Sequence, residues 1–285
     1  MADFHKYHGL GNDYLVIDPA EFPFVPDPAA VRVVCDRNYG VGSDGILLGP
    51  GPDPAHPALR ILNPDGSEAE KSGNGLRIFA WFLYEKGLAG AGPFPIKTLG
   101  GRVTARIVDP ARKVVRVDMG PPAFDARSGA SGAGLDEVLD REFAFGGETC
   151  RITFVSMGNP HCVVLGRPVT PEEARRLGPV IERSPLFPAR TNVQLLEVLS
   201  RSEIRIEIWE RGAGYTLASG SSSSAAAAVA HRLGLCGPNI TVHMPGGDLG
   251  IRLGPDFAVD MTGPVARVGE AALAAEALVA APEGI

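Results

Sequence analysis

The feature that most constrains the fold is that this chain of 285 residues repeats itself once. Four short segments recur in the same order with offsets of 142 to 147 positions: Gly11-Asn12-Asp13 as Gly158-Asn159-Pro160, Ser72-Gly73-Asn74 as Ser219-Gly220-Ser221, Gly100-Gly101 as Gly246-Gly247, and residues 118–121 as residues 260–264. Each match alone is weak in a chain with 36 glycines, but four in one order are hard to obtain by chance. The repeat predicts two homologous halves.

The length agrees with this division, since about 150 residues per domain suggests two domains. We expect an N-terminal half at residues 1–124, to which residues 265–285 return, and a C-terminal half at residues 125–264. Residues 125–134 are rich in Gly, Ser and Ala and form the predicted linker. The tail from Val265 is expected to hold a strand and a short helix.

Both halves show the same local order, in which short β-like runs precede one apolar helix. The helices are expected at residues 76–86, ended by Gly87, and at residues 223–233, ended by Gly234. Both are apolar enough to be buried. The expected strands include residues 14–17, 45–48, 114–118, 152–155, 204–209 and 257–260. With 36 glycines and 25 prolines punctuating the chain, the predicted fold class is α/β (α+β) with two pseudo-symmetric domains.

Composition excludes several classes of protein. The net charge of −6 gives no electrostatic footprint for nucleic acid. No apolar run approaches the ~18 residues of a membrane span, and the first residues lack the apolar core of a signal peptide. The four cysteines, Cys35, Cys150, Cys162 and Cys236, form no CxxC pair, so neither a disulfide framework nor a zinc site is expected. We expect a cytoplasmic protein.

The repeated Ser-Gly element has its own chemistry. A Ser-Gly turn that opens a helix presents unpaired backbone N–H groups, and the helix dipole adds positive charge there. Such a turn binds carboxylates or phosphates. Two facing halves would place Ser72 and Ser219 on opposite sides of one ligand, a geometry suited to stereochemical inversion by proton transfer. The alternative is that both serines only cap their helices, which is compatible with the first role.

Other motifs suggest nucleotide binding or hydrolase activity, but the sequence around them does not support those functions. Residues 40–45 match GxGxxG, but the run after them cannot begin a helix, as a dinucleotide-binding turn requires. The four-serine run contains no GxSxG elbow. A serine hydrolase using His8, His161 or His243 stays open, and a fluorophosphonate probe would identify it. A pure binding module also stays open, and it would show no isotope exchange at the α-carbon of its ligand.

Five segments carry a family resemblance: residues 9–18, 63–75, 158–164, 210–220 and 244–251. They resemble the signature segments of diaminopimelate epimerases, in the right order and over nearly the whole chain. The resemblance implies two domains, each with a β-barrel-like sheet around a central helix, similar in fold to proline racemases and phenazine-biosynthesis isomerases. It also implies an amino-acid epimerase without cofactor or metal, which converts LL- to meso-diaminopimelate for lysine and cell-wall synthesis. A homodimer is a further implication.

The resemblance assigns roles to residues at matching positions. The polar contacts to substrate match Asn12, Asn63, Asn159 and Asn192. Glu210 and Arg211 match the residues that recognise the distal amino-acid group. The helix N-termini that hold the reacting carboxylate match Gly73-Asn74 and Gly220-Ser221. The alternatives are turn chemistry for the asparagines and a solvated ion pair for Glu210 and Arg211.

The sequence departs from the family at its two catalytic cysteines, which match Ser72 and Ser219. A thiol at a helix N-terminus ionises readily, whereas a serine hydroxyl needs an adjacent base. Three explanations remain: a divergent isomerase that uses another base, a substrate-trapping form produced by Cys→Ser replacement, or a ligand-binding relic. The candidate alternative bases are Asp44, Glu70, Lys71 and His161. Family resemblance to the phenazine-group isomerases makes a carboxylate base one option.

Overall fold

The computed structural model describes residues 3–24, 27–53, 55–125 and 137–274. The chain divides into two compact units, one formed by Met1–Val117 with Gly263–Ile285 and the other by Asp118–Thr262. All but Asp125 of the expected linker, and the short helix expected near the C-terminus, lie outside the described residues. The α+β class and the two-part organisation expected from the sequence are confirmed.

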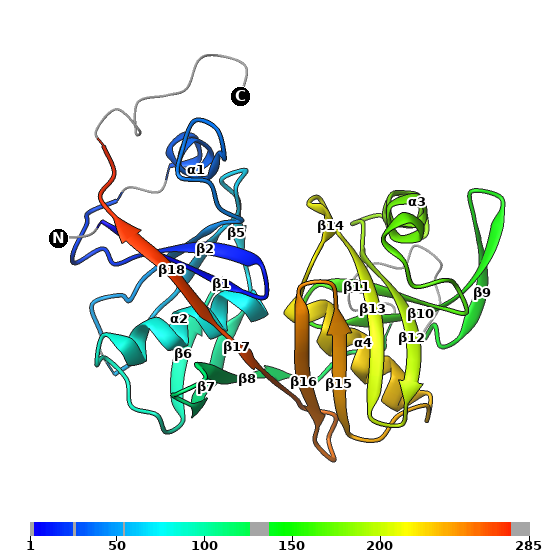
Figure 1. The fold of residues 1–285 in the computed structure, drawn as a ribbon. Coiled ribbons are helices and arrows are strands. Elements are labelled where there is room, and N and C mark those ends of the chain that lie inside the picture. Colours follow the sequence, from blue (N-terminus) through cyan, green and yellow to red (C-terminus); the bar gives the residue numbers. More distant parts are fainter. Residues whose placement is uncertain (1–2, 25–26, 54, 126–136, 275–285) are drawn as a thin grey trace. The chain divides into compact units, whose positions relative to one another are not determined.

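The first unit is built on a six-stranded sheet in the order β18-β1-β2-β3-β4-β5 (Figure 1). Its strands are β1 (Phe4–Gly9), β2 (Asn12–Ile17), β3 (Ile46–Leu48), β4 (Arg60–Leu62), β5 (Glu68–Ala69) and β18 (Ala266–Ala271). Strands β2 and β3 are parallel, and the other pairs are antiparallel. A second group pairs in the order β6 (Phe94–Thr98), β7 (Gly101–Asp109) and β8 (Val114–Gly120).

The two helices of this unit cover opposite faces of the β1–β2 hairpin. On one face, Leu15 and Ile17 pack in a buried cluster with Val31 and Val34 of α1 (Pro28–Cys35). On the other face, Tyr7 and Tyr14, which stand opposite each other in the β1–β2 ladder, reach the two ends of α2 (Gly73–Glu85). Period-two alternation of side chains along each strand produces this division.

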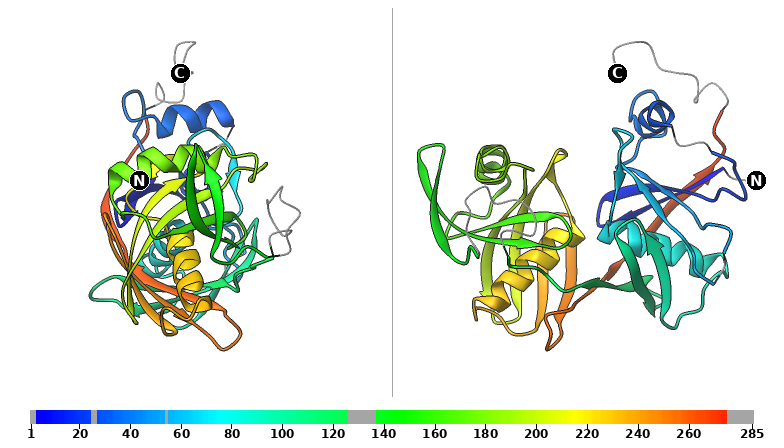
Figure 2. Two further views of the ribbon diagram at one scale, coloured as in Figure 1. Left: turned by 90° about the vertical axis from the view of Figure 1, so that its right-hand side faces the viewer. Right: turned by 180° about the vertical axis from the view of Figure 1, so that it is seen from behind.

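The second unit repeats this plan around a longer sheet, in the order β17-β16-β15-β13-β12-β11-β10-β9, with β14 beside β13. Its elements are β9 (Arg141–Phe145), β10 (Glu148–Ser156), β11 (Pro160–Leu165), α3 (Pro171–Glu182), β12 (Asn192–Ser200), β13 (Glu203–Glu210), β14 (Gly214–Thr216), α4 (Gly220–Arg232), β15 (Asn239–Met244), β16 (Gly247–Leu253) and β17 (Val259–Pro264). Figure 2 shows α4 lying along one face of these strands. Phe154 and Val193 pack with Leu177 of α3 in a buried cluster.

The two expected apolar helices are present and buried, each 13 residues long, but both begin three residues earlier than expected. Ser72 and Ser219 are their N-caps: Ser72 Oγ accepts from Gly75 N–H at 3.1 Å, and Ser219 Oγ accepts from Ser222 N–H at 3.4 Å. The N-cap bond therefore draws the glycine after each serine into the first turn. Each helix ends just before the expected glycine, Gly87 or Gly234, which takes the left-handed conformation with φ of +72°.

Helices α1 and α3 are not among the elements predicted from the sequence. Both carry a recognisable start signal, an N-cap at Asp27 or Thr170 followed directly by proline. The strand expected at residues 257–260 begins instead at Val259, because Phe257 has a φ of +62°. The GxGxxG run at residues 40–45 leads into strand β3 rather than a helix, as expected.

Candidate active site

The first half-site is formed where strand β2 meets the N-terminus of α2. Ser72 is partly exposed, and its Oγ lies 3.1 Å from the hydroxyl oxygen of Tyr14, a buried residue of β2. The first-turn residues Gly73 and Asn74 follow Ser72 on the helix. The N–H groups at a helix start have no intrahelical acceptor, and the helix dipole is positive there. This corner is therefore suited to bind a carboxylate.

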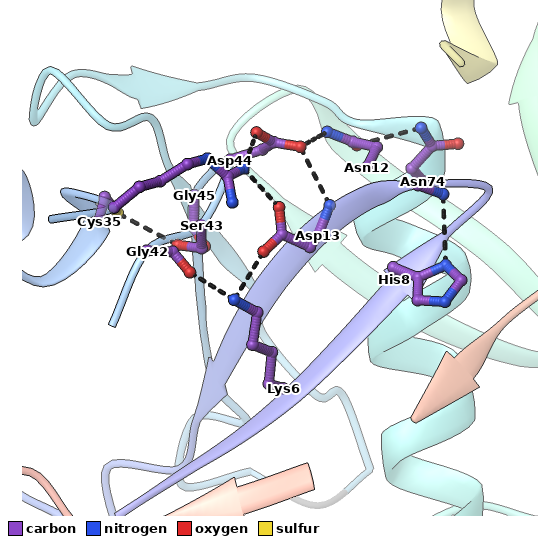
Figure 3. A network of polar contacts seen from close by, with 12 residues as sticks. Lys6, His8, Asn12, Asp13, Cys35, Gly42, Ser43, Asp44, Gly45 and Asn74 are labelled. Atoms are coloured by element: carbon purple, nitrogen blue, oxygen red, sulfur yellow. Dashed lines mark hydrogen bonds and ion pairs between the residues drawn. The ribbon is translucent and has the colours of Figure 1, made fainter. Parts of the chain in front are cut away.

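A directed chain of hydrogen bonds fixes the two asparagines beside this corner, and Figure 3 shows its part from Asn74 through Asn12 to Asp44. Arg77 Nη2 donates to Asn74 Oδ1 at 2.7 Å, and Asn74 Nδ2 donates to Asn12 Oδ1 at 3.1 Å. Asn12 Nδ2 in turn donates to Asp44 Oδ2 at 2.8 Å. A guanidinium only donates and a carboxylate only accepts, so the two ends set the orientation of both amides. Burial lowers the pKa of Arg77 to about 9, which leaves it charged at neutral pH.

Asp44 also belongs to a cluster of charged side chains, which it forms with Lys6, Asp13 and Arg37. Arg37 Nη2 lies 2.7 Å from both Asp13 Oδ1 and Asp44 Oδ1, and Lys6 Nζ lies 2.9 Å from Asp13 Oδ2. Burial acts to raise the pKa of Asp13, but hydrogen bonds from Arg37 and Lys6 outweigh it, and the net shift is downward. The contacts of Asp44 with Asn12, Arg37 and the N–H of Asp13 hold its carboxylate as an acceptor. In this arrangement Asp44 orients Asn12.

The second half-site lies at the start of α4. Ser219 is 4% exposed, and the next residues of the helix are Gly220 and Ser221, of which Ser221 is partly exposed. The buried Ser223 and Ser224 donate their hydroxyl hydrogens to the carbonyl oxygens of Ser219 and Gly220, each at 2.8 Å. These bonds satisfy hydroxyls that would otherwise be costly to bury. The serine run is thus part of the helix interior.

His161 links this half-site to Asn159. The Nε2 atom of His161 lies 2.9 Å from Asn159 Oδ1, and Nδ1 lies 3.1 Å from Gln194 Nε2, which also donates to Ser222 Oγ at 3.0 Å. Burial lowers the pKa of His161 to about 3, so the imidazole is neutral. An amide oxygen can only accept, which places the ring proton on Nε2. Both ring nitrogens are thus engaged, an arrangement that favours positioning of Asn159 over proton abstraction.

Asn192 and Glu182 fix the backbone of the turn that carries Glu210 and Arg211. Asn192 Nδ2 donates to Pro160 O at 2.8 Å, while Asn192 Oδ1 accepts from Arg211 N–H at 3.0 Å. The buried carboxylate of Glu182 accepts from Trp209 Nε1–H at 2.8 Å and from Gly212 N–H at 3.0 Å. Asn192 therefore joins the Asn159-Pro160 turn to the Glu210-Arg211 turn.

The structure groups most, but not all, of the residues expected from the sequence. Ser72, Gly73, Asn74, Asn12 and Asp44 lie together in the first unit. Ser219, Gly220, Asn159 and Asn192 belong to the second, where the His161–Gln194–Ser222 contacts link Asn159 to the start of α4. Asn63 lies in the β4–β5 turn, where Asn63 Nδ2 donates to Ser67 Oγ at 2.9 Å. Glu70 is exposed, and Lys71 is partly exposed beside Ser72.

Sequence reasoning missed Tyr14, Gln194, Arg77 and Glu182 as parts of these sites. The sequence contains one indication for Tyr14, because the repeat aligns it with the candidate base His161. The other three sit within ordinary strand or helix runs, and nothing local distinguishes them.

In the described part of the chain, no helix is long and apolar enough to cross a membrane. Within the same residues, no group of three or more His, Cys, Asp or Glu side chains could hold a metal ion. The four cysteines are buried and unbridged.

The buried imidazole of His161 gives a pH dependence of stability. Its folded pKa, about 3, lies below the ordinary value of 6.5, so the unfolded chain binds the proton more readily. Stability is therefore fully present above pH 6.5 and is lost as the pH falls toward 3. Between pH 6.5 and 5 we expect His161 to account for a loss of about 2 kcal/mol. Urea unfolding of the wild type and of His161→Gln measures it, and equal pH slopes for the two proteins would contradict it.

Sequence and structure comparisons agree with each other. The sequence model of the family described as diaminopimelate epimerase matches residues 4–124 and 153–268. The chain is 52% identical over 274 residues to diaminopimelate epimerase 2 of a Nostoc species, covering 96% of each chain. It is 43% identical to the diaminopimelate epimerase of Moorella thermoacetica, covering 93% of this chain and 96% of that one. A probable proline racemase from Agrobacterium radiobacter shares the fold, with a TM-score of 0.69 at 17% identity, over 96% of this chain and 93% of that one.

Proposed function

Since the chain belongs to the diaminopimelate epimerase family and is therefore an isomerase, we propose that it inverts the α-carbon of diaminopimelate, from LL to meso, without a cofactor. The observation that carries the proposal is the pair of 13-residue helices, each with a serine N-cap at its start. In each unit an asparagine from the repeated Gly-Asn turn is connected by hydrogen bonds to the first turns of the helix, through Asn74 or through His161, Gln194 and Ser222.

The proposed reaction needs two proton transfers at one carbon. A hydroxyl group on one face of the substrate accepts the α-proton as the Cα–H bond breaks, and the electron pair of that bond moves toward the carboxylate. A proton then reaches Cα from the opposite face. We assign these faces to Ser72 and Ser219, with the helix N-termini binding the carboxylate that receives the charge. Exclusion of water strengthens such contacts, so ligand-driven closure is part of the proposal.

Substrate recognition is assigned to the residues that match the family positions. Asn12 and Asn74 present amides whose orientation is set by neighbouring charged side chains, and the amide of Asn159 is hydrogen-bonded to His161. The Glu210-Arg211 turn, with its backbone fixed by Asn192, is assigned to the distal amino-acid group. Asn63 and Ser221 complete the proposed contacts.

A second candidate function is binding without turnover, which the serine at both base positions favours. A serine hydroxyl is a weak base unless a neighbour activates it. A protein with these half-sites and no activated hydroxyl would bind diaminopimelate and leave its α-proton in place.

One experiment separates the two candidates. The protein is incubated in D₂O with LL-diaminopimelate and with meso-diaminopimelate, and ¹H NMR follows the α-proton signal and the other stereoisomer. Calorimetry on the same samples measures binding. Exchange with inversion supports the epimerase, and binding without exchange supports the binding protein. Absence of binding to any diaminopimelate isomer would overturn both.

A further inference from the structure

We propose that Tyr14 exchanges a proton with the Ser72 hydroxyl and so gives the first half-site the acid and base capacity that serine alone lacks. This inference rests on the proposed function and adds a positioning residue that acts through Ser72. It begins from one contact, the 3.1 Å between the hydroxyl oxygens of Tyr14 and Ser72.

The hydrogen bonds around Ser72 leave its hydroxyl proton available to a ligand. Ser72 Oγ accepts from Gly75 N–H at 3.1 Å. Either hydroxyl of the Tyr14–Ser72 pair can be the donor. When Tyr14 donates, both lone pairs of Ser72 are occupied, and the Ser72 O–H is left for a third partner. Ser72 is partly exposed while Tyr14 is 7% exposed, so a ligand meets Ser72 with the phenol behind it.

Packing holds the Tyr14 ring in this position. A Cβ at Gly45 would lie 2.8 Å from Tyr14 Cε1 and 2.6 Å from Leu62 O, so glycine is needed there to leave room for the ring. A Cβ at Gly75 would similarly lie 3.2 Å from Ser72 Oγ. Two glycines thus allow the phenol and the N-cap hydroxyl to approach each other.

The transfer balances as a relay of two protons. In the donating direction, the Ser72 O–H bond breaks as its proton bonds to the carbanionic Cα, and the Tyr14 proton moves to Ser72 Oγ. The phenol is left as a phenolate, which the positive N-terminus of α2 stabilises. In the accepting direction every step reverses. Because a phenol is a stronger acid than a serine hydroxyl, the relay avoids a serine alkoxide.

The second half-site is built differently at the same repeat position. The residue that aligns with Tyr14 is His161, whose ring contacts Asn159 and Gln194, and Gln194 bonds to Ser222 rather than to the N-cap Ser219. The hydroxyl relay is thus a property of the first unit.

The test compares Tyr14→Phe with the matched control Tyr7→Phe. Tyr7 stands opposite Tyr14 in the ladder, is also buried, and hydrogen-bonds to Glu85 at the far end of α2. We expect Tyr14→Phe to lower α-proton exchange in D₂O at least about tenfold with unchanged calorimetric affinity, and Tyr7→Phe to change it less than about twofold. In a Ser72→Cys background the thiol is itself the base, so the loss caused by Tyr14→Phe should disappear.

The outcomes are distinguishable. Equal exchange rates and pH profiles for the wild type and Tyr14→Phe would overturn the relay and leave the proposed function intact. A wild type that binds diaminopimelate without exchange would overturn the relay and favour the binding function. Should Tyr14→Phe fail to fold, ¹³C NMR of ring-labelled tyrosine decides. The Tyr14 phenol should titrate at a different pH in Ser72→Ala than in the wild type, and an unmoved titration would contradict the proposal.

Discussion

Replacing Ser72 and Ser219 together by cysteine is expected to raise the rate of diaminopimelate epimerisation by about 10²–10⁴-fold, the range that a well-placed acid–base group contributes. Both serines are N-caps of 13-residue helices, so each new thiol would lie at the positive end of a helix dipole. This position lowers the pKa of a cysteine and populates the thiolate. Loss of the α-proton signal and growth of the other stereoisomer in D₂O measure the gain.

The native cysteines should interfere little with this experiment. All four are buried, and burial raises the pKa of Cys35, Cys162 and Cys236. Alkylation by iodoacetamide at neutral pH should therefore mark the thiol introduced at the partly exposed position 72 first, and the pH dependence of its rate gives the pKa of that thiol. The single variants are the controls, because inversion needs a competent group on each face. A double variant that folds, binds diaminopimelate and stays as slow as the wild type would refute the assignment of the two faces.

Replacing Glu182 by alanine is expected to destabilise the second unit by about 2–4 kcal/mol. Glu182 is 3% exposed, and its carboxylate accepts hydrogen bonds from Trp209 Nε1–H and Gly212 N–H. Alanine leaves both donors without that acceptor and opens a cavity beside Trp209. Urea unfolding at neutral pH gives the free energy of unfolding, and calorimetry of diaminopimelate binding reports on the adjoining Glu210-Arg211 turn.

The matched control is Glu172→Ala, which removes an exposed carboxylate from the first turn of the same helix. Its effect should stay below about 1 kcal/mol, as for other surface charges at a helix start. If Glu182→Ala cost no more than Glu172→Ala, the carboxylate would not be what holds the turn.

Local features of the sequence were enough to predict the two apolar helices and the serines at their start. The serine N-cap, the apolar run and the terminal glycine each act within a few residues, so pattern reasoning reaches them. The predicted starts were three residues late because the glycines after Ser72 and Ser219 read as turn residues. In the structure the N-cap bonds bring these glycines into the helix.

The contacts that distinguish the two half-sites were beyond such reasoning. Tyr14 reaches Ser72 across 58 positions, and Gln194 reaches His161 across 33. Which strand residue meets which helix end depends on sheet register, and register follows from packing of the whole unit. The chain order of the asparagines was readable from the sequence, whereas the use of both Asn192 amide atoms to tie two turns together was not.

The hydrogen-bond chain from Arg77 to Asp44 has one permitted polarity, because a cation begins it and an anion ends it. The chain through Asn159, His161, Gln194 and Ser222 has only neutral members, each able to exchange donor for acceptor by an amide turn, a tautomer shift or a hydroxyl rotation. The hydrogen-bond chain of the first unit therefore has a fixed direction, whereas the chain of the second unit can run in either direction. The amides of Asn12 and Asn74 therefore present one fixed pattern of donor and acceptor, whereas the amide of Asn159 can present either.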